Sequence, residues 1–288
     1  MRYVLLDEKI TRVAPFGVRF YDPVGKQLVT GLTVTARAAA NPARVLDLFP
    51  NPSGVYVLQN APGLRDFENG AGDADFWARL PSPRQYTIKV SDPRGEFLPF
   101  TFAAALPVKG LYVWDCEPSP PESSDVPLFS TPRRPIPAGY TAIRADLCDP
   151  IANQPAAWAL LEVTYEGRVL GRGIADARGC LCLPLAYPPP VDFEPLSPMV
   201  TGAPLTEQSW RVGVQVWYAA LAGQPDLCAI LDQRRVPAAH VWEAWDSPPG
   251  ADWLTEVEIV YGRELVLRTS EAGRPLPNLY IVPAGSPP

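Results

Sequence analysis

The chain has one histidine, His240, among its 288 residues. Catalysis by a Ser–His–Asp triad needs a histidine base, and the Gly-x-Ser-x-Gly motif that marks a hydrolase nucleophile is absent. Asp73 and Asp75 alternate in a loop-like region, which preorganises a pair of catalytic carboxylates poorly. The sequence therefore predicts a protein that is not an enzyme and has no catalytic residues.

Long apolar runs and basic runs are also missing. No apolar stretch approaches the ~18 residues that a membrane-spanning helix needs. The net charge is −6, and a basic footprint for nucleic acid is absent. Acid from Asp7 onward interrupts the N-terminus too early for a signal peptide. We expect a cytoplasmic protein without a membrane span or bound nucleic acid, with solvated arginine pairs at 133–134 and 234–235.

The chain has few cysteines, and their number is odd. The five cysteines are Cys116, Cys148, Cys180, Cys182 and Cys228. Without a signal peptide the thiols are expected to be reduced, so a reducing agent should not change the melting temperature. Cys180 and Cys182 share one strand face, where buried packing is favoured over a metal site. No cofactor or metal is expected.

Proline, in contrast, is abundant. There are 36 prolines, and hydrophobic residues make up 47% of the chain. Proline is excluded from helix interiors and from central strands, while this hydrophobic share is enough for a real core. The composition predicts an all-β chain of short strands and defined loops.

The alternation of short strands and tight turns is clearest around residues 172–184. A strand at 160–165 is followed by a Glu166-Gly167 turn and a strand at 169–174. An Asp-containing turn at 176–179 leads into a further strand, which is typical of successive hairpins. Alternating apolar residues predict another strand at 209–218. Residues 226–233 are also interpreted as a strand, and residues 41–52 as a loop.

A long insertion separates two strands of the first half, between Gly63 and Pro83. We expect a solvated loop that is held down by Phe67, Phe76 and Trp77, which are candidate partner-contact residues because long loops are often functional. A calcium site is the alternative, although the carboxylates do not follow EF-hand spacing. Those carboxylates are Asp66, Glu68, Asp73 and Asp75.

Composition divides the chain at residues 117–137, which hold seven prolines. This segment is read as a semi-rigid linker, with an extended strap across a neighbour as the alternative. The expected fold is two antiparallel β-sandwich domains of the transthyretin- or Ig-like kind, at 1–116 and 138–288. A short helix is expected near 237–246, beginning at a proline and placing Trp242 and Trp245 on one face.

Two phrases resemble a known family. Asp-Ala-Arg-Gly-Cys-Leu-Cys-Leu-Pro at 176–184 is similar to the D-x-x-G-x-x-x-L-P turn of carboxypeptidase-regulatory, transthyretin-like β-sandwich modules, and residues 20–34 and 53–58 echo it. The phrase at 90–100, followed by Leu106-Pro107, resembles accessory proteins of phage-tail-like contractile injection systems. The resemblance implies a sandwich that acts through its surfaces.

The favoured function is therefore a structural or adaptor protein of a large assembly, plausibly a contractile injection particle. Its partners would be protein subunits, with homo-oligomerisation left open. The alternative is a carbohydrate-binding or adhesin-like module, with Trp242 and Trp245 as its first contact candidates and Trp253 as a third. That alternative requires coplanar aromatic rings exposed on one face.

Overall fold

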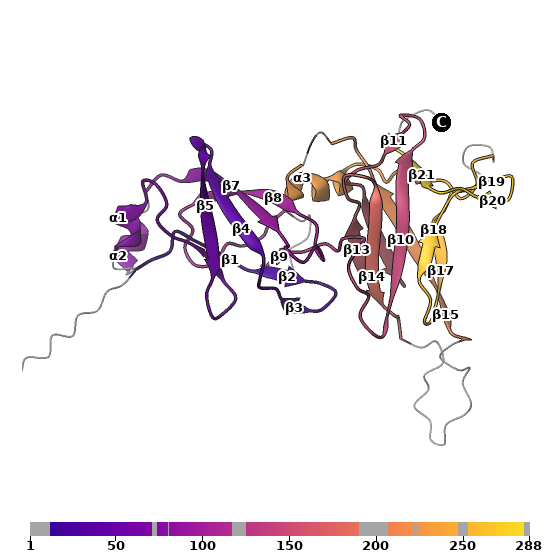
Figure 1. The fold of residues 1–288 in the computed structure, drawn as a ribbon, viewed down its shortest axis with the longest axis horizontal. Coiled ribbons are helices and arrows are strands. Elements are labelled where there is room, and N and C mark those ends of the chain that lie inside the picture. The colour runs from indigo at the N-terminus through magenta and orange to yellow at the C-terminus, as the bar shows by residue number, and fades with distance from the viewer. Residues whose placement is uncertain are drawn as a thin grey trace, which may run out of the picture.

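The computed structural model describes residues 12–70, 74–79, 81–116, 125–189, 207–221, 223, 225–246 and 253–284. Strands dominate these residues, and two β-rich halves lie next to each other along the longest axis (Figure 1). The helices are short: α1 (Arg65–Glu68), α2 (Ala74–Ala78), α3 (Leu227–Leu231) and the 3₁₀ helix η2 (Asp232–Arg235). Within the described ranges, no helix is long and apolar enough to cross a membrane.

A six-stranded sheet with the order β1-β6-β5-β4-β7-β8 forms most of the first half. Its strands are β1 (Phe16–Val18), β4 (Thr33–Ala38), β5 (Asn41–Pro50), β6 (Tyr56–Leu58), β7 (Arg84–Ser91) and β8 (Phe100–Leu106). A small sheet joins β2 (Phe20–Asp22) to β3 (Gln27–Leu28) and to β9 (Val126–Pro127). Along β7, Tyr86, Ile88 and Val90 alternate inward, because a strand directs successive side chains to opposite faces.

The second half contains two larger sheets that share a core. Four strands form the first: β12 (Leu160–Tyr165), β13 (Arg168–Ile174), β15 (Ser209–Trp217) and β17 (Glu256–Val260). The second is built around β10 (Tyr140–Asp149) with β11 (Gln154–Pro155), β14 (Cys180–Ala186), β16 (His240–Val241), β18 (Leu265–Leu267) and β21 (Leu279–Val282). A separate ribbon pairs β19 (Ser270–Glu271) with β20 (Arg274–Pro275). Ile143, Leu183 and Val214 illustrate the shared core, because they come from both sheets.

The strands and turns expected between 160 and 186 form, but the second turn does not close a hairpin. Glu166 and Gly167 have positive φ and join β12 to β13, as predicted. After Asp176 the chain crosses instead to the other sheet, where β14 pairs with β10 and not with β13. Asp176 accepts hydrogen bonds from two backbone N–H groups of this turn. Gly179 has φ +80°, and a Cβ there would collide with the carbonyl oxygen of Leu147, so only glycine fits.

Residues 125–134 lie on the first half as an extended strap. Backbone hydrogen bonds fasten it, and β9 pairs with β2. Arg134 forms a buried ion pair with Asp22, with Nη1–Oδ1 at 2.9 Å, and its guanidinium lies 4.8 Å from the centre of the Phe97 ring. The surface that these residues cross belongs to the same chain. The expectation that Arg134 is solvated is wrong.

The helix expected near 237–246 is absent, and one lies just before it instead. Residues 240–241 form β16, which pairs with β21, and Trp242 bridges Trp253. Burial of Trp242 in this sheet edge outweighs the weak helical preference that a first-turn proline gives. The strand expected at 226–233 is helix α3, because the Asp226 side chain accepts a hydrogen bond from the Cys228 N–H and caps it.

Helix α3 joins the two halves. It lies between β8 and the sheets of the second half (Figure 1). Leu227, Ile230 and Leu231 are part of the first core, which is the hydrophobic cluster formed mainly by the first half. Trp158 and Trp217 of the second half belong to the same cluster. Burial of these apolar side chains favours one fixed arrangement of the halves.

Candidate functional site

The three aromatic residues predicted in the insertion come together in space. The ring centres of Phe67 and Phe76 lie 4.6 Å apart, and Trp77 packs edge-on against both at 5.6 and 5.2 Å. These are favourable aromatic geometries. The insertion contains α1 and α2 rather than the expected continuous loop. Phe67 is buried, so only the half-buried Phe76 and Trp77 are placed to contact a partner.

One carboxylate of the alternative calcium site is already held by backbone groups. Glu68 is buried, and its two carboxylate oxygens accept hydrogen bonds from the N–H groups of Asn60 and Ala61 at 2.9 and 2.8 Å. In the part of the chain that the structure describes, no group of three or more His, Cys, Asp or Glu residues could hold a metal. Asp73 lies outside the described residues.

Trp242 and Trp245 are close, but they do not form a flat platform. Their ring centres lie 5.0 Å apart with planes at 67°, and Trp253 is tilted by 36° against Trp242. Trp242 is also buried. A glycan-binding surface was expected to need coplanar, exposed rings, so this cluster lacks the feature on which the carbohydrate alternative depends.

His240 is exposed on β16. Its ring centre lies 3.7 Å from that of Trp253, and its side chain forms no hydrogen bond or ion pair with any described residue. A nucleophile–base pair requires hydrogen-bond contact between the two side chains. Among the described residues His240 makes a tilted ring contact with Trp253 and no contact of that kind.

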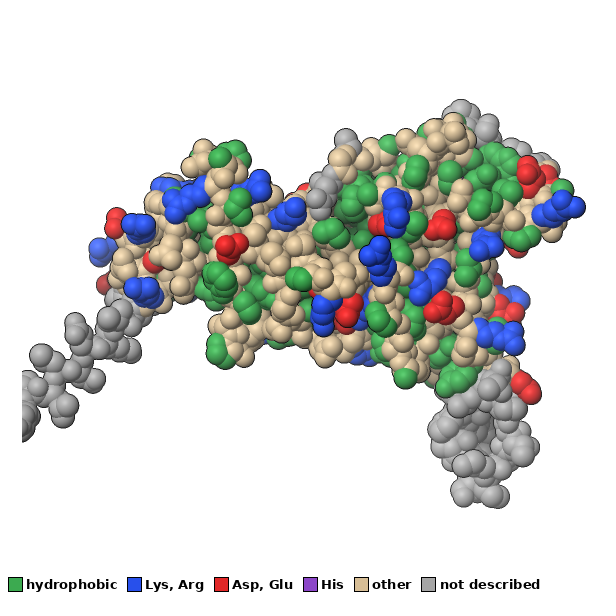
Figure 2. All heavy atoms as spheres, viewed as in Figure 1, with side chains coloured by type: hydrophobic (Ala, Val, Ile, Leu, Met, Phe, Trp, Pro, Cys, Tyr) green, Lys and Arg blue, Asp and Glu red, His purple; other side chains and the backbone are tan. Residues whose placement is uncertain are grey.

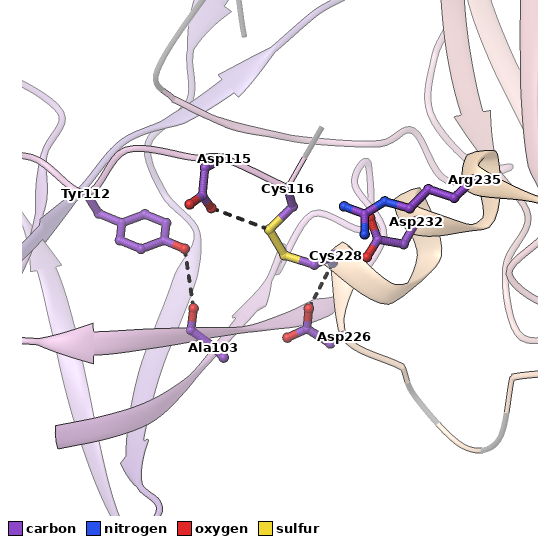
Figure 3. The surroundings of a disulfide bond; sticks show 8 residues. All are labelled: Ala103, Tyr112, Asp115, Cys116, Asp226, Cys228, Asp232 and Arg235. Carbon is purple, nitrogen blue, oxygen red and sulfur yellow. Dashed lines mark hydrogen bonds and ion pairs between the residues drawn. A yellow bond between two sulfur atoms is a disulfide. The ribbon is translucent and has the colours of Figure 1, made fainter. Parts of the chain in front are cut away.

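The expectation that all thiols are reduced is wrong for Cys116 and Cys228, which form a disulfide. Figure 3 shows the bond between the segment that follows β8 and helix α3. Nearby, Tyr112 donates a hydrogen bond to the Ala103 carbonyl at 3.3 Å, and burial raises the pKa of Tyr112 to about 12. The covalent link therefore sits where α3 joins the two halves.

The remaining thiols are free. They belong to Cys148, Cys180 and Cys182. Cys182 is buried on β14 opposite Arg144. Burial, followed by a hydrogen bond with Asp146, raises the pKa of Cys180 to about 11, which keeps this thiol protonated at neutral pH and poorly nucleophilic.

Strand β5, in a stretch that the sequence predicts to be a loop, is paired along only part of one edge. Residues 45–48 pair with β4, as does Asn41, while only Phe49 and Pro50 pair with β6. The edge of residues 41–48 that faces away from β4 has no strand partner among the described residues. Val45 is 44% and Phe49 70% exposed.

Two features of the sequence could have predicted β5. The inward residues Leu46 and Leu48 alternate with the outward Val45 and Phe49, which is the period of a strand. Pro42 and Pro50 flank this run, and proline inside a strand is typical of sheet edges. The prediction of a loop gives the prolines more weight than this alternation.

Comparison with known proteins adds little. No protein-family model matches the chain, and no curated protein is similar to it. Among solved structures, the chain is 10% identical to the Bacillus anthracis TIE protein, with a TM-score of 0.26 over 90% of this chain and 34% of that one. It thus spans about a third of that protein's length. Shaft pilin SpaA from Lactobacillus rhamnosus GG is 10% identical, with a TM-score of 0.22 over 96% of this chain and 99% of the pilin. Similarities this small do not establish a shared fold.

Proposed function

We propose that the chain is a non-enzymatic structural or adaptor protein, which binds other protein subunits of a larger assembly through the free edge of β5. The observation that carries this proposal is the unpaired edge of residues 41–48 beside the exposed side chains of Val45 and Phe49. An exposed edge presents N–H and C=O groups that pair with an added strand. Exposed apolar side chains beside it add specificity.

The proposed architecture is two β-sandwich domains joined through the Pro-rich segment 117–137. The Cys116–Cys228 disulfide and the shared packing of α3 support a fixed relation between them. A rigid pair of domains would hold the β5 edge at a defined distance from any contact made by the second half. This rigidity suits an adaptor, because preorganised surfaces lose less entropy on binding.

The assembly that the resemblance of residues 90–100 favours is a phage-tail-like contractile injection particle. Self-assembly through two β5 edges is the competing outcome, because an open edge can pair with a second copy. Disulfides are rare in a reducing cytosol. We therefore propose that the assembled protein works in an oxidising environment, in place of the cytoplasmic location that the sequence suggested.

The test is affinity purification of the tagged protein from its native host at modest salt, followed by mass spectrometry. The variant V45K/F49K places lysines at the β5 edge, where they oppose strand addition. The matched control is V169K, because Val169 is 46% exposed on β13 in the other half. We expect sheath, tube or baseplate subunits with the wild type and V169K, and about tenfold less with V45K/F49K.

Two results would contradict the proposal. The first is equal recovery of the same subunits by all three proteins, which would exclude the β5 edge as the contact. The second is elution of the chain without any particle subunit. Elution only as a homo-oligomer that V45K/F49K disrupts would keep the edge but replace the partner with a second copy.

A further inference from the structure

A cavity of about 440 Å³ opens at one end of the first core. It lies where the tip of the β4–β5 hairpin, the start of β7 and the loop after β6 meet. Ala38, Leu46 and Pro62 form apolar walls, and Arg44, Arg84 and Tyr86 supply its polar groups. Its volume falls within the usual range for small-molecule sites, about 300–1,000 Å³.

Tyr86 brings an unsatisfied polar group to this cavity. It lies on the inward face of β7, opposite Ala38 of β4, and is 2% exposed. Its hydroxyl is buried and has no hydrogen-bond partner among the described residues. A buried hydroxyl without a partner destabilises the fold, and such exceptions need a reason.

Two arginines flank the same cavity. Arg84 donates a hydrogen bond from Nη1 to the Pro62 carbonyl at 3.0 Å, which leaves most of its N–H groups available. A Cβ on Gly63 would collide with the Arg84 guanidinium, so this glycine leaves room for the charged group. Arg44 forms no hydrogen bond or ion pair with any described residue.

No carboxylate of the described residues neutralises these arginines. Glu68 is near enough to influence Tyr86 electrostatically, but its oxygens are held by the N–H groups of Asn60 and Ala61. Figure 2 shows Lys and Arg side chains beside hydrophobic ones at the upper end of the first half, where Figure 1 places the β4–β5 hairpin tip. The cavity is thus apolar inside and positively charged at its rim.

We propose that this cavity binds a carboxylate attached to an apolar group. Arg44 and Arg84 would bind the carboxylate through charge-assisted hydrogen bonds, and the hydroxyl of Tyr86 would donate a third. Ala38, Leu46 and Pro62 would contact the apolar group. The same chemistry occurs in the C-terminal residue of a peptide and in a small free carboxylic acid. This inference does not depend on the proposed function of the β5 edge.

Calorimetric titration of the full chain tests the carboxylate. The probes are N-acetyl-leucine, N-acetyl-leucinamide, hexanoate and inorganic phosphate. We expect saturable binding of N-acetyl-leucine and none of the amide, which has the same apolar group without the charge. Hexanoate binding as tightly as N-acetyl-leucine would indicate a free acid as the source, and weaker binding a peptide C-terminus.

Variants assign the binding to this cavity. R44Q and R84Q should each weaken N-acetyl-leucine about tenfold, since a hydrogen bond to a charged group is lost. R37Q is the matched control, because Arg37 is exposed on β4 one residue before Ala38 but does not line the cavity. Equal weakening by R37Q, binding of the amide as tight as that of the acid, binding of phosphate alone, or no saturable binding would each overturn the proposal.

Tyr86 provides a readout that a purely structural role would not produce. In Y86F the unpartnered hydroxyl is gone, so the melting temperature without ligand should rise by about 2 °C or more. The affinity for N-acetyl-leucine should fall in the same variant. A lower melting temperature, or an unchanged affinity, would show that the hydroxyl does not serve a ligand.

Discussion

Replacing Cys116 and Cys228 by serine should destabilise the chain substantially. The disulfide joins residues 112 positions apart. A cross-link that closes a loop of about 100 residues raises the free energy of the unfolded chain by roughly 4.7 kcal/mol at 25 °C, because the chain loses conformational entropy. Measured effects of removing native disulfides are typically about 2–5 kcal/mol. The bond also ties α3 to the end of the first half, so we expect a loss of about 3 kcal/mol or more in the free energy of unfolding.

Urea unfolding with and without a reducing agent measures this effect. The wild type and C180S, which lacks only a free thiol, should both shift to lower urea on reduction, while C116S/C228S should not respond. Thiol titration of the unfolded, unreduced wild type should find the three thiols of Cys148, Cys180 and Cys182. Five titratable thiols, or a wild-type urea midpoint that does not change with the reducing agent, would refute the reasoning. Either result would support the sequence-based expectation that all five thiols are reduced.

Three further predictions concern single contacts. R134A should cost about 3–5 kcal/mol in the free energy of unfolding, because it leaves the buried Asp22 carboxylate without its counter-charge, whereas D22N/R134M should recover most of that loss. Similar urea midpoints for the two variants would contradict this. Burial raises the pKa of Asp226 above its ordinary 3.8, so the folded state binds this proton more tightly and stability falls as pH rises above 3.8. D226N keeps the helix cap and should flatten that part of the pH profile, which a wild-type-like slope would disprove. G179A should lower the melting temperature by several degrees, because it forces a Cβ against the Leu147 carbonyl at a positive φ. An unchanged melting temperature would contradict the predicted clash.

Local signals predicted much of the second half. The alternation of Trp210, Val212, Val214 and Val216 gave a strand that the structure confirms as β15. The Glu166-Gly167 turn was also predictable, because a positive φ at both positions suits a two-residue hairpin. These features depend on neighbours in the chain, which the sequence displays directly.

Other features depend on which distant segments meet. The turn at Asp176 shows its chemistry in the sequence, but whether it closes a hairpin or crosses between sheets depends on β10, which is remote in the chain. The sequence predicts that Arg134 lies on the surface, because its buried partner Asp22 is remote in the chain. The Cys116–Cys228 pairing likewise follows from the position of α3, which spacing does not reveal.

The candidate site likewise combines features that the sequence could indicate with features that depend on distant segments. The clustering of Phe67, Phe76 and Trp77 follows from their apolar character and proximity, so the sequence could indicate it. The free edge of β5 could not be predicted, because an edge is defined by the strand that is missing beside it. Tyr86 gives no signal in the sequence, since its unpartnered hydroxyl depends on three segments that meet around the cavity.

The most direct test of an assembly role is gradient sedimentation of native-host lysate with detection of this chain across the fractions. We predict that the wild type and V169K travel with the sheath, tube or baseplate subunits of a large particle, and that V45K/F49K shifts to the position of the free chain. Wild-type protein found only at the position of the free chain, in fractions without particle subunits, would contradict the account.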